Sequence, residues 1–267
     1  MSTREARWPE GVPAWVDLRV PDRQAARRFY GKLFGWDFEE AGRGAAYYTT
    51  CLRGGRRAAA FSTLPPGSAP AQWTTYLATD DIDAAVERCV AHGGQVVEEV
   101  AHLDERGVER VMAILADPTG AVFGLWQSGG HTGADVVNEP GTVVWNEIMT
   151  RDVPAAREFY GQLFDYVFGD MSGPGFTYNT LEISGHIAGG MGGIPADTAQ
   201  DVPTSWTTYF AVADTDASVD LATRLGGEVA SPAADSAYGR MAVIRGPFGE
   251  TFALMSTEEE PTPPLTR

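Results

Sequence analysis

Two carboxylates, Asp17 and Glu147, stand where they could do chemistry. Asp17 lies two residues after Trp15, and Glu147 lies two residues after Trp145, each within a run of β-forming residues. Side chains two residues apart on a strand share a face, so each carboxylate lies beside an aromatic ring. There it could anchor a polar ligand group, or act as a general base if burial raises its pKa. An ion pair with an arginine such as Arg19, or a strand end that reaches water, is the structural alternative.

The two carboxylates belong to a duplicated segment. Each is followed by a helical pattern ending in Phe-Tyr-Gly-x-Leu-Phe, at residues 29–34 and again at 159–164, an offset of 130 residues (159 − 29). A Trp-Thr-Thr-Tyr run also recurs, at 73–76 and at 206–209. A repeat of this length indicates a duplicated domain rather than a solenoid unit.

Each half contains the order βαβββ twice. A β pattern at 14–20 stops at Pro21, Asp22 is placed to cap the helix that follows, and Gly35 ends that helix. The same order starts again at Trp73, so the chain is an α+β protein of four βαβββ modules. We predict a flexible N-terminal arm (1–12), a first domain (13–128), a linker (129–141), a second domain (142–256) and a disordered tail (257–267).

This layout resembles the vicinal-oxygen-chelate superfamily, which includes glyoxalase I, bleomycin-resistance proteins and extradiol dioxygenases. The resemblance covers roughly residues 14–127 and 143–255, and it includes the Asp-Pro-Thr-Gly turn at 117–120. The Trp-x-Asp/Glu opening is similar to a tandem-domain actinobacterial subfamily labelled glyoxalase-like or hydroxylase. The resemblance implies two cup-shaped mixed sheets with helices packed outside. It allows the modules to pair within a repeat or across repeats.

Strand periodicity separates an apolar face, suited to lie under helices, from a mixed face. The mixed face combines aromatic, hydroxyl and carboxylate groups, as a ligand-binding surface does. The tryptophans could stack on a flat ligand or simply fill the cups. The ligand-binding residues predicted on this face are Trp15, Asp17, Thr74, Tyr76, Trp126, Trp145, Glu147, Thr207 and Tyr209.

Further polar residues are less firmly placed. Arg240 could hold an anionic ligand group, and an exposed strand position is its alternative. In the first half, Val111 stands where Arg240 does, so the two cups are not equivalent. Four tyrosines are expected near the rims of the cups: Tyr47, Tyr48, Tyr178 and Tyr238.

The positions that hold a metal in the superfamily lack suitable donors here. The resemblance places those ligands on the first strand of each module and on the closing strands. They fall at Trp15, Thr74, Gly124, Trp145, Thr207 and Ala253. A divalent ion needs several imidazole or carboxylate donors that converge, so we predict no metal site and no cofactor.

The histidines do not change this prediction. The interpretation we favour is that all four are surface or capping residues: His92, His102, His131 and His186. An unusual metal set of Asp17, Glu147 and one histidine is the alternative.

Composition limits the partners. The chain has 267 residues and a formal net charge of −16, so we expect repulsion from nucleic acid and from anionic membranes. Its only cysteines, Cys51 and Cys89, lack metal or redox spacing and are expected to be buried thiols. With no run of about 18 apolar residues, we expect a cytoplasmic monomer or homodimer.

Three functions follow from these observations. The first is a glyoxalase- or bleomycin-resistance-like protein that binds a small, partly apolar or aromatic molecule in cups without the usual metal. The second is a lyase, hydroxylase or dioxygenase-like enzyme that uses Asp17 or Glu147 as acid or base. The third is a non-catalytic interaction protein whose cups are filled.

Overall fold

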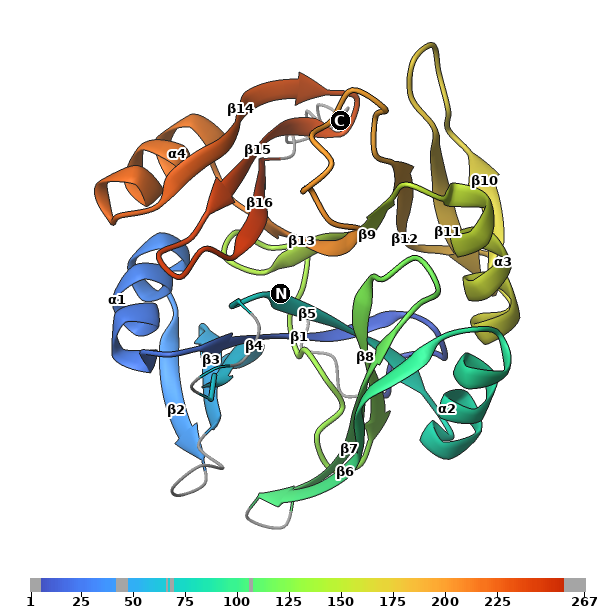
Figure 1. Ribbon diagram of the computed structural model, residues 1–267. Helices are drawn as coiled ribbons and strands as arrows, with labels where there is room; N and C mark the ends of the chain where they lie inside the picture. The colour runs from blue at the N-terminus through green and yellow to red at the C-terminus, as the bar shows by residue number, and fades with distance from the viewer. Residues whose placement is uncertain (1–5, 42–47, 66, 68–69, 106–107, 257–267) are drawn as a thin grey trace, which may run out of the picture.

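A computed structural model describes residues 6–41, 48–65, 67, 70–105 and 108–256 of the chain (Figure 1). The first domain comprises β1 (Pro13–Val20), α1 (Arg23–Phe34), β2 (Asp37–Ala41), β3 (Tyr48–Arg53), β4 (Arg56–Thr63), β5 (Trp73–Thr79), α2 (Ile82–Ala91), β6 (Gln95–Glu105), β7 (Val108–Ala116) and β8 (Val122–Ser128). The second comprises β9 (Val143–Thr150), α3 (Val153–Phe164), β10 (Val167–Asp170), β11 (Tyr178–Ile183), β12 (His186–Gly193), β13 (Ser205–Ala211), α4 (Thr215–Arg224), β14 (Glu228–Ser236), β15 (Gly239–Arg245) and β16 (Thr251–Ser256). The prediction of four βαβββ modules is confirmed.

Each domain forms one mixed eight-stranded sheet. The strand orders are β2-β3-β4-β1-β5-β8-β7-β6 and β10-β11-β12-β9-β13-β16-β15-β14. The first strands of the two modules pair antiparallel at the centre, β1 with β5 and β9 with β13. Modules therefore pair within a repeat, which settles the choice that the sequence left open.

The helices begin and end where local chemistry requires. Asp22, Asp81, Asp152 and Asp214 each accept a hydrogen bond from the backbone N–H three residues later. Gly35 ends α1 with φ 65°, a left-handed conformation that glycine adopts at little cost. None of the helices in the described ranges is long and apolar enough to cross a membrane.

The first sheet is strongly curled, as one ion pair demonstrates. Arg19 on β1 pairs with Glu98 on β6, and three strands lie between them in the sheet. In a flat sheet the two strands would be about 19 Å apart, four spacings of about 4.8 Å. Only a sheet that curls toward this face brings the two side chains into contact. Both sheets curl in this way, with their concave faces turned away from each other (Figure 1).

The helices lie between the two sheets rather than in the cups. α1 lies beside α4, and α2 beside α3, on opposite sides of the molecule (Figure 1). Rings of one domain pack against the other, as with Phe34 and Phe210, whose centroids are 4.7 Å apart. At the centre, Thr75 and Thr208 both donate to the Asn146 side-chain oxygen. The convex faces are thus buried against each other.

A buried carboxylate lies in the turn before the last strand of each domain, at different sequence positions, and the one in the second domain joins the two domains. Glu250 accepts from the Tyr30 hydroxyl of α1 (2.5 Å) and from the backbone N–H of Phe248. In the first domain, Asp117 accepts the equivalent turn N–H, from Thr119. A side chain at Gly246, the counterpart of Asp117, would overlap the Glu250 carboxylate. Each turn therefore has one carboxylate in the same place: Asp117 in the first domain and Glu250 in the second.

This exchange predicts a rescue. Gly246→Asp alone should lower the free energy of unfolding by about 2 kcal/mol or more, because two side chains compete for one buried place. Adding Glu250→Ala recreates the arrangement of the first domain and should restore most of the loss. Urea unfolding measures each variant, and a double variant no more stable than Gly246→Asp would contradict the exchange.

Candidate functional site

A chain of hydrogen bonds crosses the concave face of the second domain. The Trp145 indole N–H donates to the Tyr178 hydroxyl (3.0 Å), which donates to Glu147 Oε2 (2.6 Å). The Tyr209 hydroxyl donates to Glu147 Oε1 (2.6 Å). β9, β11 and β13 bring these four residues together. Both carboxylate oxygens therefore have a phenol donor.

Burial governs the ionisation of this group. The Glu147 side chain is 8% exposed, and loss of water raises its pKa above the usual value, opposed by the tyrosine hydrogen bonds. Burial, together with the Glu147 charge, also raises the pKa of Tyr178 and Tyr209 well above that of a free phenol. Both tyrosines consequently remain donors at neutral pH.

The first domain carries the same pattern. The Trp15 indole N–H donates to the Tyr48 hydroxyl (2.6 Å), and the Tyr76 hydroxyl donates to Asp17 Oδ2 (3.1 Å). The four residues occupy the equivalent strand positions, with aspartate in place of glutamate, and two of the three hydrogen bonds of the second domain recur: indole to phenol, and phenol to carboxylate. The two predicted carboxylates thus occupy matching networks.

The two concave faces differ in exposure. On the first, Trp15, Asp17 and Tyr76 are at most 2% exposed. On the second, Trp145 and Tyr178 are partly exposed. The partly exposed side chains beside them are apolar or hydroxyl-bearing: Val144, Met149, Thr207, Met241 and Val243. The second face is therefore the one that a solvent-borne molecule can reach.

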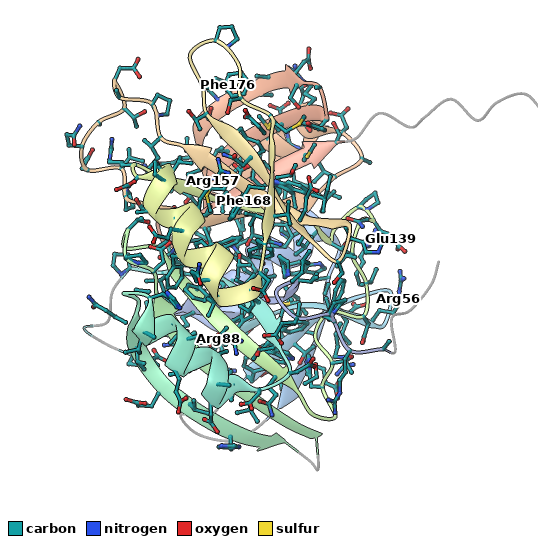
Figure 2. All side chains as sticks on the ribbon, turned by 90° about the vertical axis from the view of Figure 1, so that its right-hand side faces the viewer. Arg56, Arg88, Glu139, Arg157, Phe168 and Phe176 are labelled. Atoms are coloured by element: carbon teal, nitrogen blue, oxygen red, sulfur yellow. The ribbon has the colours of Figure 1, made fainter. Side chains whose placement is uncertain are left out.

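The linker covers the first face. Asp135 accepts two hydrogen bonds from the Arg57 guanidinium, and Arg56 pairs with Glu139 (2.6 Å; Figure 2). Burial alone would raise the pKa of Asp135, but the Arg57 hydrogen bonds hold it below its usual value. Trp8, from the predicted arm, donates to the Ala134 carbonyl. These contacts fix the segment 131–137 against the first sheet.

The expected metal positions do not form a donor set. Trp15 and Trp145 use their indole N–H groups as donors, and the register places Thr74 opposite Asp17. A Cβ at Gly124 would overlap the Tyr76 ring, so no carboxylate side chain fits at that position. Across the described residues, no group of three His, Cys, Asp or Glu side chains is placed to hold an ion. The residues present do not fit the metal centre of the superfamily.

Two residues lie elsewhere than the sequence suggested. Arg240 lies on the helix side of β15, where it pairs with Asp216 of α4 (2.7 Å) and with Asp235 (2.8 Å). It is not brought together with the other predicted ligand-binding residues, and its strand neighbour Met241 faces the cup instead. The interpretation of His131 as a surface residue was wrong, because it is 5% exposed and packs against Trp126. The predicted ligand-binding residues other than Arg240 lie on the concave faces.

Tyr48 and Tyr178 are network members that the sequence placed only near the rims. Their separation of 130 residues (178 − 48) equals that of the two carboxylates, and this shared offset was the signal that could have found them. Tyr47, predicted with them, lies outside the described residues.

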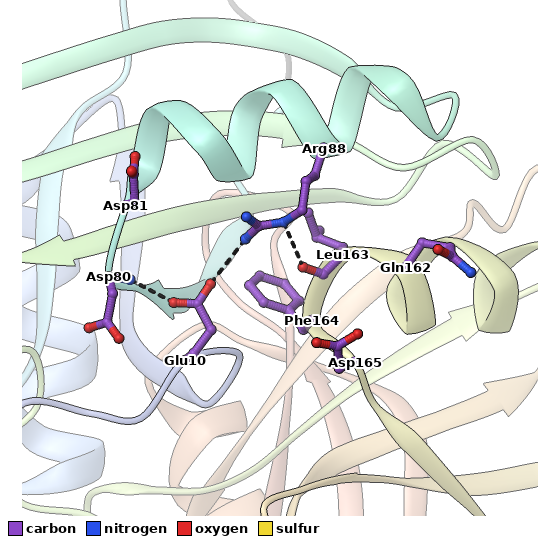
Figure 3. Close-up of a pocket in the computed structure, with 8 residues that line it drawn as sticks. All are labelled: Glu10, Asp80, Asp81, Arg88, Gln162, Leu163, Phe164 and Asp165. Atoms are coloured by element: carbon purple, nitrogen blue, oxygen red, sulfur yellow. Dashed lines mark hydrogen bonds and ion pairs between the residues drawn. The ribbon is translucent and has the colours of Figure 1, made fainter.

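Two surface hollows lie away from both concave faces. One, of about 410 Å³, lies between α2 and the end of α3 (Figure 3). There Arg88 pairs with Glu10 and donates to the Leu163 carbonyl, both at 3.2 Å. The other, of about 490 Å³, lies beside the start of α1. Neither contains a predicted ligand-binding residue.

Comparisons with known proteins agree with this architecture. A family model described as Glyoxalase/Bleomycin resistance protein/Dioxygenase superfamily matches residues 13–125. "Putative glyoxylase CFP32" of Mycobacterium tuberculosis is 37% identical, over 94% of this chain and 97% of that protein. Anthracycline biosynthesis protein DnrV of Streptomyces peucetius is 36% identical, over 95% and 96%. The Mn(II)-bound glyoxalase from Novosphingobium aromaticivorans has a TM-score of 0.63 at 15% identity, over 94% and 84%, which shows a shared fold alone.

The overlap at Gly124 predicts a strong coupling with Tyr76. Gly124→Ala should lower the free energy of unfolding by about 1–3 kcal/mol, because the methyl group meets the buried ring. In a Tyr76→Ala background the same change should cost much less. Equal costs in the two backgrounds, measured by urea unfolding, would contradict this packing.

Glu147 predicts a pH dependence of stability. Burial raises its pKa in the folded state above 4.5, the ordinary value of a glutamate carboxyl, so the folded protein binds the proton more tightly than the unfolded chain does. This contribution is present below pH 4.5 and is lost as pH rises through the folded pKa. The stability of Glu147→Gln relative to wild type should therefore increase with pH. Glu228→Gln, at an exposed position, is the control, and a pH-independent difference for Glu147→Gln would contradict the prediction.

Proposed function

The chain belongs to the glyoxalase/bleomycin resistance/dioxygenase superfamily, and we propose that it binds a small, partly apolar or aromatic molecule on the concave face of its second domain. We propose further that this binding uses no metal ion. The observation that carries the proposal is the partly exposed Trp145–Tyr178–Glu147–Tyr209 network, whose counterpart in the first domain is buried.

The composition of the second face suits such a ligand. Met149, Met241 and Met255 provide flexible, polarisable side chains that adapt to a flat ring. Thr207 lies opposite Glu147 in the register and adds one hydroxyl that can orient the ligand. A mostly apolar surface with a few polar groups is typical of small-molecule sites. The relationship to an anthracycline biosynthesis protein favours a polycyclic aromatic ligand.

The donor set supports binding without a metal. In the second domain, the three positions that the resemblance assigns to metal ligands hold Trp145, Thr207 and Ala253. None of these side chains supplies an imidazole or a carboxylate. Glu147 accepts a hydrogen bond from a phenol on each oxygen, so a cation would compete with both donors for the carboxylate charge.

An acid or base role for Glu147 is the second candidate function. The burial that raises its pKa favours this role, since a general base works best with a pKa near the working pH. Against it, each oxygen already accepts a tyrosine hydrogen bond, and these two bonds weaken the carboxylate as a base. Binding is therefore the primary proposal.

Equilibrium dialysis with 1,8-dihydroxyanthraquinone tests the site. Met241→Ala should weaken binding about fivefold or more, because roughly 1 kcal/mol of apolar contact is lost. Met112→Ala, at the equivalent place in the first domain, is the matched control and should leave affinity unchanged. Equal effects of the two substitutions, or no binding by the wild type, would contradict the proposal.

Elemental analysis tests the metal-free part. Protein purified without chelator should contain far less than one transition metal ion per chain by inductively coupled plasma mass spectrometry. One stoichiometric ion per domain, lost together with affinity for the probe after dialysis against a chelator, would overturn it.

A further inference from the structure

The imidazole of His131 occupies a site on the first concave face. Its ring centroid lies 4.8 Å from that of Trp15, with the planes at 81°, and 4.9 Å from that of Trp126, at 65°. The Trp126 indole N–H donates to the His131 carbonyl (3.2 Å), and the backbone N–H of Gly133 donates to His131 Nδ1 (3.1 Å). A planar ring is thus held edge-on by two tryptophans and a hydrogen bond.

The backbone around this ring is fitted to the sheet. Ala134 N–H donates to the Ala14 carbonyl at the start of β1, and Asp135 N–H donates to the Arg57 carbonyl at the start of β4. Gly133 adopts φ 106°, and a Cβ there would overlap the Ala14 carbonyl. Only glycine therefore lets the linker approach β1 so closely.

The second face lacks two features that enclose the first, namely the Trp126 ring and the Arg19–Glu98 ion pair. Met255 stands where Trp126 does, at an offset of 129 residues (255 − 126). The Arg19–Glu98 ion pair, which spans the first face, is replaced by Met149 and Ser231. The same residue positions form both groups, but the linker packs on the first, whereas Trp145 and Tyr178 of the second are partly exposed.

We infer that the first concave face is a small-molecule site permanently occupied by the linker, with the His131 imidazole in the place of a ligand ring. The ring that fits is a small, neutral, planar heteroaromatic, because Nδ1 accepts a hydrogen bond and two indoles enclose it. It follows that binding of an external ligand is confined to the second face, one molecule per chain. This last consequence rests on the proposed function, whereas occupation of the first face does not.

Chemical rescue tests the occupant. His131→Gly removes the imidazole and should create a site for 4-methylimidazole, the free analogue of the histidine side chain. In the full-length variant the probe should raise the melting temperature in a saturable way, by about 5 °C at about 100 times its dissociation constant. The effect should grow as pH is raised and the probe loses its proton.

The matched control is His186→Gly, which removes an exposed imidazole at the start of β12. Neither this variant nor the wild type should be stabilised by the probe. A folded His131→Gly protein, judged by circular dichroism, that responds no more than His186→Gly would overturn the inference.

A second measurement needs no variant. Diethylpyrocarbonate modifies accessible imidazoles, and His92, His102 and His186 are exposed whereas His131 is buried. Mass spectrometry of briefly treated wild-type protein should find the first three modified and His131 protected by at least tenfold. Modification of His131 at the rate of the others would overturn the inference.

The two proposals can fail separately. Rescue by 4-methylimidazole together with no anthraquinone binding would leave the occupied first face standing and remove the proposed function. Two anthraquinone molecules bound per wild-type chain would support ligand binding by the second face but would contradict the occupation of the first face by the linker.

Discussion

The burial of a carboxylate on a concave sheet face is the constraint from which the site follows. Removing an ionised group from water is unfavourable unless hydrogen bonds replace the lost hydration. On the second face two tyrosines supply these bonds to Glu147, and Trp145 in turn orients Tyr178. The network uses the aromatic side chains of three strands, so its geometry depends on the whole curled sheet. In this arrangement the Trp145 indole, at a position that the superfamily resemblance assigns to a metal ligand, is a hydrogen-bond donor within the network.

Duplication provided two copies of this network, and the copies have diverged in what covers them. The first is enclosed by a tryptophan, an ion pair and the linker. The second has methionines in these surroundings, and its Trp145 and Tyr178 side chains are partly exposed. Such divergence is possible because the two domains bury their convex faces against each other, which leaves each concave face free to change. The shared core needs both domains, whereas the proposed binding of a ligand would use only the second cup.

Much of this architecture could be predicted from the sequence. Helix caps, the apolar stripes and the alternation of strand faces are local properties, so the assignment of Trp15, Asp17 and Tyr76 to one face was correct. The pairing of modules within a repeat could not be predicted, since both arrangements satisfy the same local pattern. Strand register could have corrected Arg240, because Met241 pairs with Met255, a residue already on the cup face.

The burial of His131 could not be predicted for a different reason. The linker is rich in glycine and polar residues, and such composition indicates a connection without saying where it packs. Its position is fixed by partners far along the chain, Arg57 and Trp126 among them. Tyr48 and Tyr178 reach their networks through tertiary register rather than through a local motif, and only their 130-residue offset, which the two carboxylates share, indicates the link.

Methyl NMR of the methionines is the most direct test of the central claim, that the second concave face alone receives the ligand. The seven methionines include Met149, Met241 and Met255 on that face, Met112 on the first and Met191 in the core beneath the helices. On titration with 1,8-dihydroxyanthraquinone, the first three should shift while Met112 and Met191 stay in place. Shifts at Met112 equal to those at Met241, or binding that moves none of the three, would contradict the account.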